Sequence, residues 1–325
     1  MACETKRKEK RTMDGDQYGW LNEKPLDWWQ WMLKGLLQLR PMPKHIAIIM
    51  DGNRRYARAS HMETTCGHIR GFNQLTKVLT WCRALNITEV SVYAFSIENF
   101  KRSPTEVNEL MGLLEAKLYT LLSEMEKIAK EQVSFRFCGD LSFFPKKIQS
   151  LIARIELQTM NFTRYKVNVC VAYTSQNEMQ RAFSAISAGV RKGLLDVDDI
   201  DEELITRCLD TANCSDPDML IRTSGEKRFS DFLLWQAKII PKNFIFYTMH
   251  TIQTLGCEAC LFIFQCSTCY IHFDDVLWPE FGFWNLFKAL LGYQSSLSQI
   301  MVSITVYLKP ILPQDSVSIF TFVLD

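Results

Sequence analysis

The sequence predicts an α/β fold in which a mainly parallel six-stranded sheet is covered by helices. Short apolar runs rich in valine and isoleucine alternate with longer amphipathic segments from residue 45 onward, which is the order of βαβ units. A hydrophobic content of 47% with 22% charged residues supplies a large core. Several apolar runs also stop abruptly at polar residues, as strands of a parallel sheet do at a ligand-binding edge.

Each predicted strand is a run of apolar, often β-branched residues that is too short for a core helix. The strands are expected at residues 45–50, 88–95, 133–138, 167–173, 218–222 and 270–273. The helices are expected at residues 68–85, 104–130, 145–160, 177–192, 201–210 and 280–292. The start of helix 104–130 is marked by Ser103 as N-cap, Pro104 at the first helical position and Glu106 at the third.

The first 40 residues divide into a polar tail and one amphipathic helix. Residues 1–24 are polar and are expected to be disordered. Residues 25–40 are expected to form a helix that associates with a membrane interface. Its apolar face would carry Leu26, Trp29, Leu33, Leu36 and Leu37, and its polar face Asp27, Gln30, Lys34 and Gln38. The helix is shorter than the roughly 20 residues that span a bilayer, and packing on the protein's own core is the alternative.

Charge and cysteine content narrow the class of protein. A net charge of +1 provides no overall field for binding nucleic acid, so no nucleic-acid partner is expected. No N-terminal apolar stretch has the proportions of a secretory leader, which favours a reducing, cytosol-facing location and free thiols for most of the 11 cysteines. Two C-x-x-C pairs, Cys257/Cys260 and Cys266/Cys269, are close together in an apolar segment. Free thiols are favoured there, with a structural zinc site as the alternative.

The run IAIIMDGNRRY at residues 46–56 is the most informative motif. A buried strand would place Asp51 at its carboxyl end, where this carboxylate can hold a divalent cation beside phosphates. Gly52 and Asn53 tolerate positive φ, so successive backbone N–H groups can form a nest for an anion. Arg54 and Arg55 add permanent positive charge.

Two other predicted strand ends carry arginine together with hydroxyl or amide donors. Ser96, Asn99, Phe100 and Arg102 follow the strand that ends at Phe95, and Arg222, Arg228 and Ser230 follow strand 218–222. His68 opens the first long helix behind Asp51. Because the carboxyl ends of parallel strands lie at one edge, these clusters predict a site for more than one phosphate group. Neither G-x-x-x-x-G-K-[ST] nor G-x-G-x-x-G is present, which disfavours a nucleotide-binding fold.

Five segments together resemble the cis-prenyltransferase family: HIAIIMDGNRRYA, VYAFSIENFKRS, VCVAYTS, DMLIRTSGEKRFSDFLLWQ and VLWPEFGFWNL. The resemblance covers residues 42–294, within a predicted domain at 41–294, and is nearest to the eukaryotic members that make the dolichol precursor. It implies an apolar tunnel in the α/β fold and successive cis addition of isopentenyl diphosphate to farnesyl diphosphate, with Mg²⁺ as cofactor. It also implies a peripheral enzyme at the cytosolic face of the endoplasmic reticulum membrane.

The resemblance also implies a role for each site residue. Asp51 would be the catalytic carboxylate that holds Mg²⁺. The allylic diphosphate would be bound by Gly52, Asn53, Arg54, Arg55 and His68. Ser96 and Asn99 would lie near the reacting carbons, Phe95 and Phe100 would line the substrate, and Arg102 would be a further active-site arginine. Isopentenyl diphosphate would be bound by Arg222, Arg228 and Ser230. Glu106 matches a family glutamate, but its place at the helix start already explains it and no catalytic role is assigned.

The chain departs from the family pattern at three places. Thr64 stands where the family has an arginine, for which Arg58 or Arg70 could substitute. Residues 237–265 are an atypical insertion, interpreted as an added hairpin, a splice variant or a misassembled coding sequence. Residues 295–325 form an atypical apolar, β-prone C-terminal tail that lacks a terminal Arg-x-Gly, so the resemblance implies a partner subunit like the Nogo-B receptor that supplies it.

Two alternatives to an active prenyltransferase stay open. Thr64 and the insertion motivate a non-catalytic splice-variant subunit that binds the partner or a lipid diphosphate. The basic loops alone also fit an α/β phosphoanhydride hydrolase, which would need a positioned water and no long tunnel.

Overall fold

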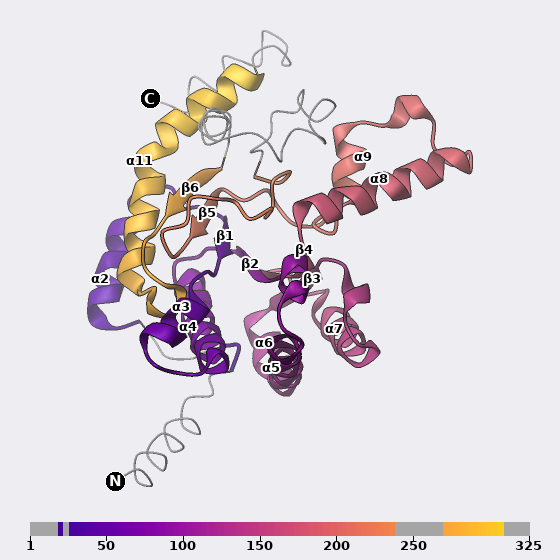
Figure 1. Cartoon of the computed structure of the whole chain (residues 1–325). Coiled ribbons are helices and arrows are strands. Elements are labelled where there is room, and N and C mark those ends of the chain that lie inside the picture. Colours follow the sequence, from indigo (N-terminus) through magenta and orange to yellow (C-terminus); the bar gives the residue numbers. More distant parts are fainter. Residues whose placement is uncertain (1–18, 22–25, 238–268, 309–325) are drawn as a thin grey trace.

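Six strands form one parallel sheet at the centre of the protein (Figure 1). The computed structural model describes residues 19–21, 26–237 and 269–308. The strands are β1 (His45–Ile49), β2 (Glu89–Ser96), β3 (Val133–Cys138), β4 (Tyr165–Tyr173), β5 (Met219–Arg222) and β6 (Tyr270–Phe273). Their order is β3-β4-β2-β1-β5-β6, and every neighbouring pair is parallel. The predicted fold class and strand positions are confirmed.

The strand order reverses at β1, which pairs with β2 on one side and with β5 on the other. In open α/β sheets, ligands bind outside the carboxyl ends of the strands at such a switch point. The register places Ile49 of β1 beside Arg222 of β5. Asp51 and Arg222 therefore lie on neighbouring strand ends at the place where the topology favours a ligand site.

Alternation along the strands buries both faces of the sheet. Ile46 and Ile48 belong to the larger apolar core, whereas Ala47 and Ile49 belong to a smaller core on the opposite face. Successive side chains of a strand point to opposite faces, and a parallel sheet is covered on both, so a continuous apolar run is what β1 requires.

The helices follow the predicted order, except that one is split in two, one is longer and one was not predicted. They are α2 (Trp28–Leu37), α3 (Asn53–Ala59), α4 (Thr64–Ala84), α5 (Pro104–Ser123), α6 (Met125–Glu131), α7 (Lys146–Thr159), α8 (Ser175–Arg191), α9 (Glu202–Cys208) and α11 (Phe283–Leu308). The predicted helix 104–130 is two helices, α5 and α6, which meet at Glu124. The last helix continues to Leu308, so the prediction of a β-prone segment from residue 295 is wrong as far as residue 308. The short helix α3 was not predicted.

Trp20 and Leu21 are buried, although they fall in the tail predicted to be disordered. The indole Nε1 of Trp20 donates to the carbonyl of Lys117 at 2.8 Å, and its backbone N–H donates to Glu124 at 2.7 Å. The ring also packs edge-on against Phe72. This anchoring explains why these residues join the core. Of the rest of the predicted tail, only residue 19 belongs to the described residues.

Helix α2 is apolar on both sides rather than amphipathic as predicted. Leu37 is buried and Trp29 packs edge-on against Phe283 of α11, so one face lies on the core. Gln30, expected on the polar face, is buried because its side chain caps the backbone N–H of Asp27 at 3.0 Å. The outward face carries exposed Trp28, Trp31, Met32, Leu36 and Leu39, and Leu36 was expected to face inward. In the part of the chain that the structure describes, no helix is long and apolar enough to cross a bilayer.

The seven described cysteines are all free thiols, as expected from the sequence. Of the two C-x-x-C pairs, Cys257, Cys260 and Cys266 lie outside the described residues, and Cys269 is buried. Almost all of the insertion at 237–265 also lies outside them. The chain nevertheless returns to the sheet as β6, which pairs with β5 at the sheet edge.

Candidate active site

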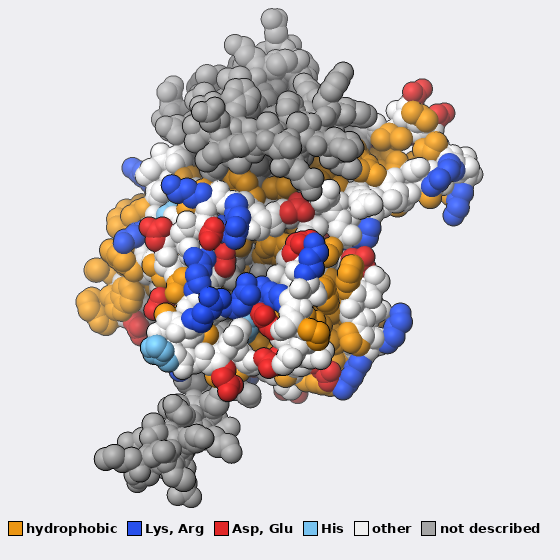
Figure 2. All heavy atoms as spheres, viewed as in Figure 1, with side chains coloured by type: hydrophobic (Ala, Val, Ile, Leu, Met, Phe, Trp, Pro, Cys, Tyr) orange, Lys and Arg blue, Asp and Glu red, His pale blue; other side chains and the backbone are white. Residues whose placement is uncertain are grey.

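A cavity of ≈ 580 Å³ opens at the carboxyl ends of β1, β2 and β5. Its lining includes thirteen of the fourteen residues predicted for the site: Asp51, Gly52, Asn53, Arg54, Arg55, His68, Phe95, Ser96, Asn99, Arg102, Arg222, Arg228 and Ser230. Figure 2 shows lysine and arginine side chains gathered near the centre of one face of the molecule. The strand-end clusters, which are far apart in the sequence, thus meet in one cavity, here called the main cavity.

Asp51 is the central carboxylate of the main cavity. Its Oδ2 accepts a hydrogen bond from Arg222 Nη2 at 2.9 Å, and its Oδ1 accepts from the backbone N–H of Gly52 at 2.7 Å. Arg55 Nη2 lies 3.7 Å from the same Oδ2. The side chain keeps 33% of its accessible surface, so solvent and ligands can reach it. Asp51 therefore links the arginines of β5 to those of α3.

Gly52 allows the turn between β1 and α3. Its φ is +108°, and a Cβ there would come within 2.9 Å of the Leu277 side chain, so both conformation and space require glycine. Asn53 could also tolerate positive φ, but it begins α3 and is helical. Because α3 starts shortly after β1 ends, its first backbone N–H groups have no intrahelical partner at this edge of the sheet.

Arg54 and Arg102 share one counter-ion in the main cavity. Arg102 Nη1 donates to Glu106 Oε1 at 2.9 Å, and Arg54 Nη1 lies 3.9 Å from the same oxygen. Burial and the nearby charge of Arg54 lower the pKa of Arg102. Ser103 caps α5 by accepting from the Glu106 backbone N–H, as predicted, but the Glu106 carboxylate turns to the arginines instead. Glu106 is thus a neighbour of the site and not only a helix-start residue.

The loop after β5 is arranged around Arg222, which is 2% exposed. Its Nη1 donates to Ser230 Oγ at 2.7 Å and also to the backbone carbonyl of Arg228. Ser230 has a φ of +50°, and Asp231 follows with +57°, so this loop holds a conformation that non-glycine residues seldom adopt. Arg228 itself keeps 70% of its side chain exposed and lies 3.8 Å from Glu226.

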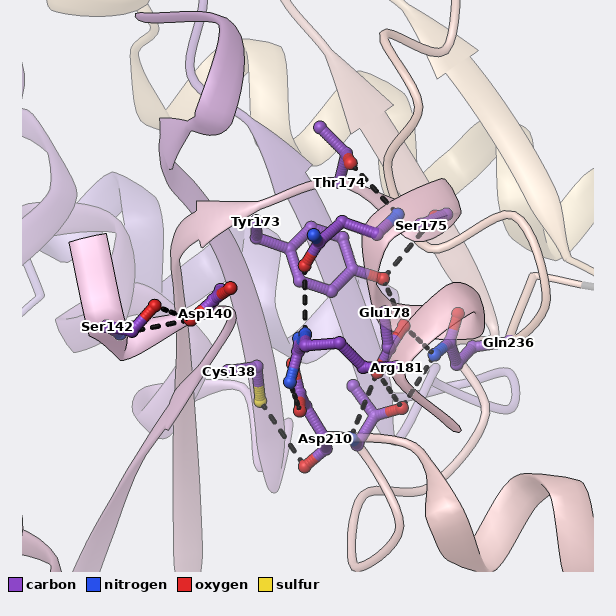
Figure 3. Close-up of polar contacts among 12 residues, drawn as sticks. Cys138, Asp140, Ser142, Tyr173, Thr174, Ser175, Glu178, Arg181, Asp210 and Gln236 are labelled. Atoms are coloured by element: carbon purple, nitrogen blue, oxygen red, sulfur yellow. Dashed lines mark hydrogen bonds and ion pairs between the residues drawn. The ribbon is translucent and has the colours of Figure 1, made fainter. Parts of the chain in front are cut away.

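A buried polar cluster beyond this loop holds it against α8 (Figure 3). Ser175 donates its backbone N–H to the Asp231 carbonyl at 2.8 Å. Glu178, 1% exposed, accepts from the Tyr173 hydroxyl at 2.6 Å and from Gln236 Nε2 at 2.9 Å. Burial raises the pKa of Glu178. The start of α8 therefore holds the segment from Asp231 to Gln236, which directly follows Ser230.

Ser96 and Asn99 cap a short 3₁₀ helix at the end of β2. The Ser96 hydroxyl accepts from the Glu98 N–H at 3.2 Å, and Asn99 Oδ1 accepts from the Ser96 N–H at 3.1 Å. Both side chains still line the main cavity. Phe100 does not line it: its ring packs on Phe95 with centroids 4.9 Å apart. In this structure Phe100 lies against Phe95 rather than in the cavity lining, and its predicted place along the substrate stays a prediction.

His68 lies between the main cavity and a smaller apolar one. Burial, and then the positive charge of Arg102, lower its pKa to about 4, so the imidazole is neutral at physiological pH. The sequence predicted His68 at the start of its helix, but α4 begins at Thr64, so His68 lies in its second turn. Its Nε2 and the Oδ1 of Asn53 are buried without a hydrogen-bond partner.

The smaller cavity, of ≈ 130 Å³, is bounded mainly by apolar side chains of α4, α5 and the sheet. It shares Met50, His68 and Phe95 with the main cavity. Trp20 forms part of its wall, although its sequence position gave no indication of this.

Several other cavity residues were missed as site residues from the sequence. They include Tyr93, Glu98, Thr174, Gln176 and Asp231; Arg58, which the sequence offered only as a replacement for a cation at position 64, also lines the cavity. The strand-end argument that found Asp51 also applies to Thr174, which directly follows β4, and would have included it. The Tyr93 hydroxyl donates to the carbonyls of Tyr173 and Ser230, and only the folded loop reveals this.

Comparisons with known proteins agree with this geometry. A family model described as undecaprenyl diphosphate synthase matches residues 49–250. A dehydrodolichyl diphosphate synthase complex subunit from Homo sapiens is 44% identical over 89% of this chain and 78% of its own length. A tritrans,polycis-undecaprenyl-diphosphate synthase from Thermoplasma volcanium is 35% identical over 78% of this chain and 87% of its own. The crystal structure of lavandulyl diphosphate synthase from Lavandula x intermedia, in complex with dimethylallyl diphosphate, superposes with a TM-score of 0.64 at 30% identity, covering 78% of this chain and 95% of that one.

Proposed function

The chain belongs to the undecaprenyl diphosphate synthase family of cis-prenyltransferases, and we propose that it extends farnesyl diphosphate with isopentenyl diphosphate units to make dehydrodolichyl or longer polyprenyl diphosphates. The observation that carries this proposal is the meeting of two basic clusters on either side of Asp51. The α3 side carries Arg54, His68 and Arg102, and the β5 side carries Arg222, Arg228 and Ser230. Two clusters match a reaction that holds two diphosphates at once.

In the proposed reaction the allylic C–O bond breaks and pyrophosphate leaves with the bonding electrons. The double bond of isopentenyl diphosphate then attacks the allylic carbocation, and a proton is lost from the new C–C unit. Arginines that are already oriented stabilise the charge that develops on the leaving phosphates without reorganisation. Arg54 and Arg102 would bind the leaving diphosphate, while Arg222 and Ser230 would hold the diphosphate of the attacking unit.

Asp51 fits the role of a Mg²⁺ ligand only together with substrate oxygens. Among the described residues, no group of three or more carboxylate, histidine or cysteine side chains could hold a metal ion. Mg²⁺ is commonly bound by one or two carboxylates plus substrate phosphates, and the accessible Asp51 satisfies that pattern. When bound, Mg²⁺ would neutralise charge on the diphosphate oxygens.

The growing chain requires an apolar environment behind the reacting carbons. Each CH₂ that leaves water contributes roughly 0.8 kcal/mol, so every added unit favours a dry path. We propose that the smaller apolar cavity is the entrance to a tunnel for this tail, because it adjoins the main cavity at Phe95. Its present volume of ≈ 130 Å³ implies that the wall beside Trp20 must give way as the product lengthens.

An elongation assay tests the function. The full chain and its partner subunit are incubated with radiolabelled isopentenyl diphosphate, farnesyl diphosphate and Mg²⁺, and lipids are extracted and separated by length. A ladder of extended polyprenyl diphosphates supports the proposal. Absence of product with retained partner binding would favour the non-catalytic subunit, and release of phosphate without extension would favour the hydrolase.

We also propose that α2 brings the enzyme to the cytosolic face of the endoplasmic reticulum membrane as a peripheral protein. Trp28 and Trp31 are 78% and 70% exposed beside exposed Leu36 and Leu39. Tryptophan favours the membrane–water interface, and an apolar outer face on a docked helix is costly in water. Deleting the N-terminus would remove Leu37 from the core, so exposed residues make the better test.

The membrane proposal predicts the behaviour of a double variant. Trp28→Ser with Trp31→Ser should reduce co-sedimentation with vesicles of phosphatidylcholine and phosphatidylserine. The matched control is Leu194→Ser, which removes an equally exposed apolar side chain (76%) after α8. Equal co-sedimentation of the double variant, the control and the unmodified chain would refute the proposal.

A partner subunit is the remaining part of the proposal. The human relative is named as a subunit of a complex. We propose a heteromer with a subunit resembling the Nogo-B receptor that supplies a terminal Arg-x-Gly to the main cavity. Elongation should then rise when that subunit is added and fall when its terminal Arg-x-Gly is removed; product formation that is independent of the subunit would contradict this.

A further inference from the structure

Arg58 differs from the other arginines of the main cavity in having no partner among the described residues. Six arginines line the cavity, against three carboxylates, Asp51, Glu98 and Asp231. Five of the six are engaged by carboxylates: Arg54 and Arg102 by Glu106, Arg55 by Asp51 and Glu226, Arg222 by Asp51, and Arg228 by Glu226. We propose that Arg58 is a further substrate-binding residue that contacts the allylic diphosphate.

The position of Arg58 on α3 supports this assignment. It lies one helical turn after Arg54, so the two guanidinium groups share a face, and like charges at this spacing repel each other. Ala57 is the buried residue of α3, and Arg58 points away from the core. Its place in the last turn is favourable for the helix dipole, which explains a cation there but not why the side chain lines the cavity. A bound diphosphate would relieve the repulsion and pair the free guanidinium.

The residues that follow α3 provide no competing cation. Thr64 begins α4 and lies outside the lining of the main cavity. Arg70, also on α4, is exposed and lies outside the lining of the main cavity as well. Of the two arginines that the sequence offered as replacements for a cation at position 64, only Arg58 reaches the cavity. Because Arg58 lies on α3 one turn after Arg54, we assign it to the α3 side of the main cavity.

Steady-state kinetics in which the concentration of each substrate is varied in turn test this inference, which rests on the proposed function. Arg58→Ala should raise the KM for farnesyl diphosphate roughly 10- to 100-fold, the range expected for one lost charge-assisted hydrogen bond. The KM for isopentenyl diphosphate should stay within about twofold, and Arg58→Lys should recover much of the loss. Arg70→Ala is the matched control, because it removes an exposed arginine outside the cavity. Since Arg58 is exposed, the midpoint of thermal unfolding should be the same for the variant and the control.

Binding of inorganic pyrophosphate, measured by calorimetry, separates this inference from the proposed function. If the unmodified chain fails to extend farnesyl diphosphate but Arg58→Ala still weakens pyrophosphate binding at least fivefold, the Arg58 site stands and the proposed function fails. If the unmodified chain extends its substrate while Arg58→Ala matches Arg70→Ala in both KM values and in pyrophosphate binding, the inference is overturned.

Discussion

Replacing Arg222 by methionine is the sharpest perturbation of the β5 side of the site. Arg222 is 2% exposed and donates to Asp51 at 2.9 Å and to Ser230 Oγ at 2.7 Å. Methionine has a similar length and no charge, so it can fill the buried space without leaving an unpaired cation. The variant should therefore fold, while Asp51 and Ser230 lose the group that holds them together.

The expected magnitude follows from those two contacts. A hydrogen bond to a charged group contributes about 1.5–3 kcal/mol, which sets an upper bound of about 6 kcal/mol for both. Asp51 keeps 33% of its side-chain surface and its bond from the Gly52 N–H, so water replaces part of the loss. We therefore expect about 2–3 kcal/mol, which corresponds to a roughly 30- to 150-fold rise in the KM for isopentenyl diphosphate.

Steady-state extension assays measure this effect directly. The KM for isopentenyl diphosphate is determined at saturating farnesyl diphosphate, and the reverse titration supplies the internal comparison. Lys227→Met is the control, because Lys227 is an exposed cation of the same loop that lies outside the lining of the main cavity. An unchanged KM for isopentenyl diphosphate in Arg222→Met, with the fold intact by circular dichroism, would refute this account of the β5 side.

Three other predictions follow from the same structure. Asp51→Asn should lower kcat by about 10²-fold or more, because it removes the central carboxylate while keeping the Gly52 contact. It should also lower the unfolding temperature, because the buried Arg222 loses its carboxylate partner; near-normal kcat would contradict the role of Asp51. Trp20→Ala should lower the free energy of unfolding by about 3–5 kcal/mol, measured with urea. It should also shift the products to longer chains, because it opens the wall of the smaller cavity. Unchanged stability would argue against a structural role for Trp20, and unchanged product length would argue against a role in limiting chain length. Burial is the main cause that lowers the pKa values of His45 and His68, so their neutral forms stabilise the fold fully above about pH 6.5. This stabilisation should be lost as the pH falls toward about 4, the pKa of His68 in the folded protein. Thermal unfolding measured from pH 7.5 to 4.5 checks this, and a midpoint that does not fall would exclude the effect.

The sheet and most of the site could be predicted from the sequence because both depend on local patterns. An apolar run such as 45–49 has few alternatives to a buried parallel strand once amphipathic helices flank it. In a parallel sheet all carboxyl ends lie along one edge. The clusters after β1, β2 and β5 therefore had to meet, whatever the details of the loops.

Features that depend on packing between distant segments could not be predicted in this way. Trp20 is buried because Lys117 and Glu124 supply acceptors for its indole and backbone N–H groups, and nothing near residue 20 indicates this. Gln30 is polar by composition but is buried as a cap for Asp27. In both cases tertiary partners decide the environment of a residue whose local pattern points elsewhere.

Glu106 illustrates a local rule that is correct but incomplete. The helix start at Ser103 is where the capping pattern placed it, and the Glu106 backbone N–H is capped as expected. The carboxylate, however, has a stronger partner in Arg102, at 2.9 Å. A capping pattern specifies backbone geometry, whereas a neighbouring guanidinium decides where the side chain points.

We expect two diphosphates to bind on opposite sides of Asp51 in one cavity. A crystal structure of the full chain with farnesyl thiodiphosphate, isopentenyl diphosphate and Mg²⁺ would show both positions. One diphosphate should lie against Arg54 and Arg102 and the other against Arg222 and Ser230, with Asp51 between them. A single diphosphate site, or a second diphosphate bound away from Arg222, would contradict it.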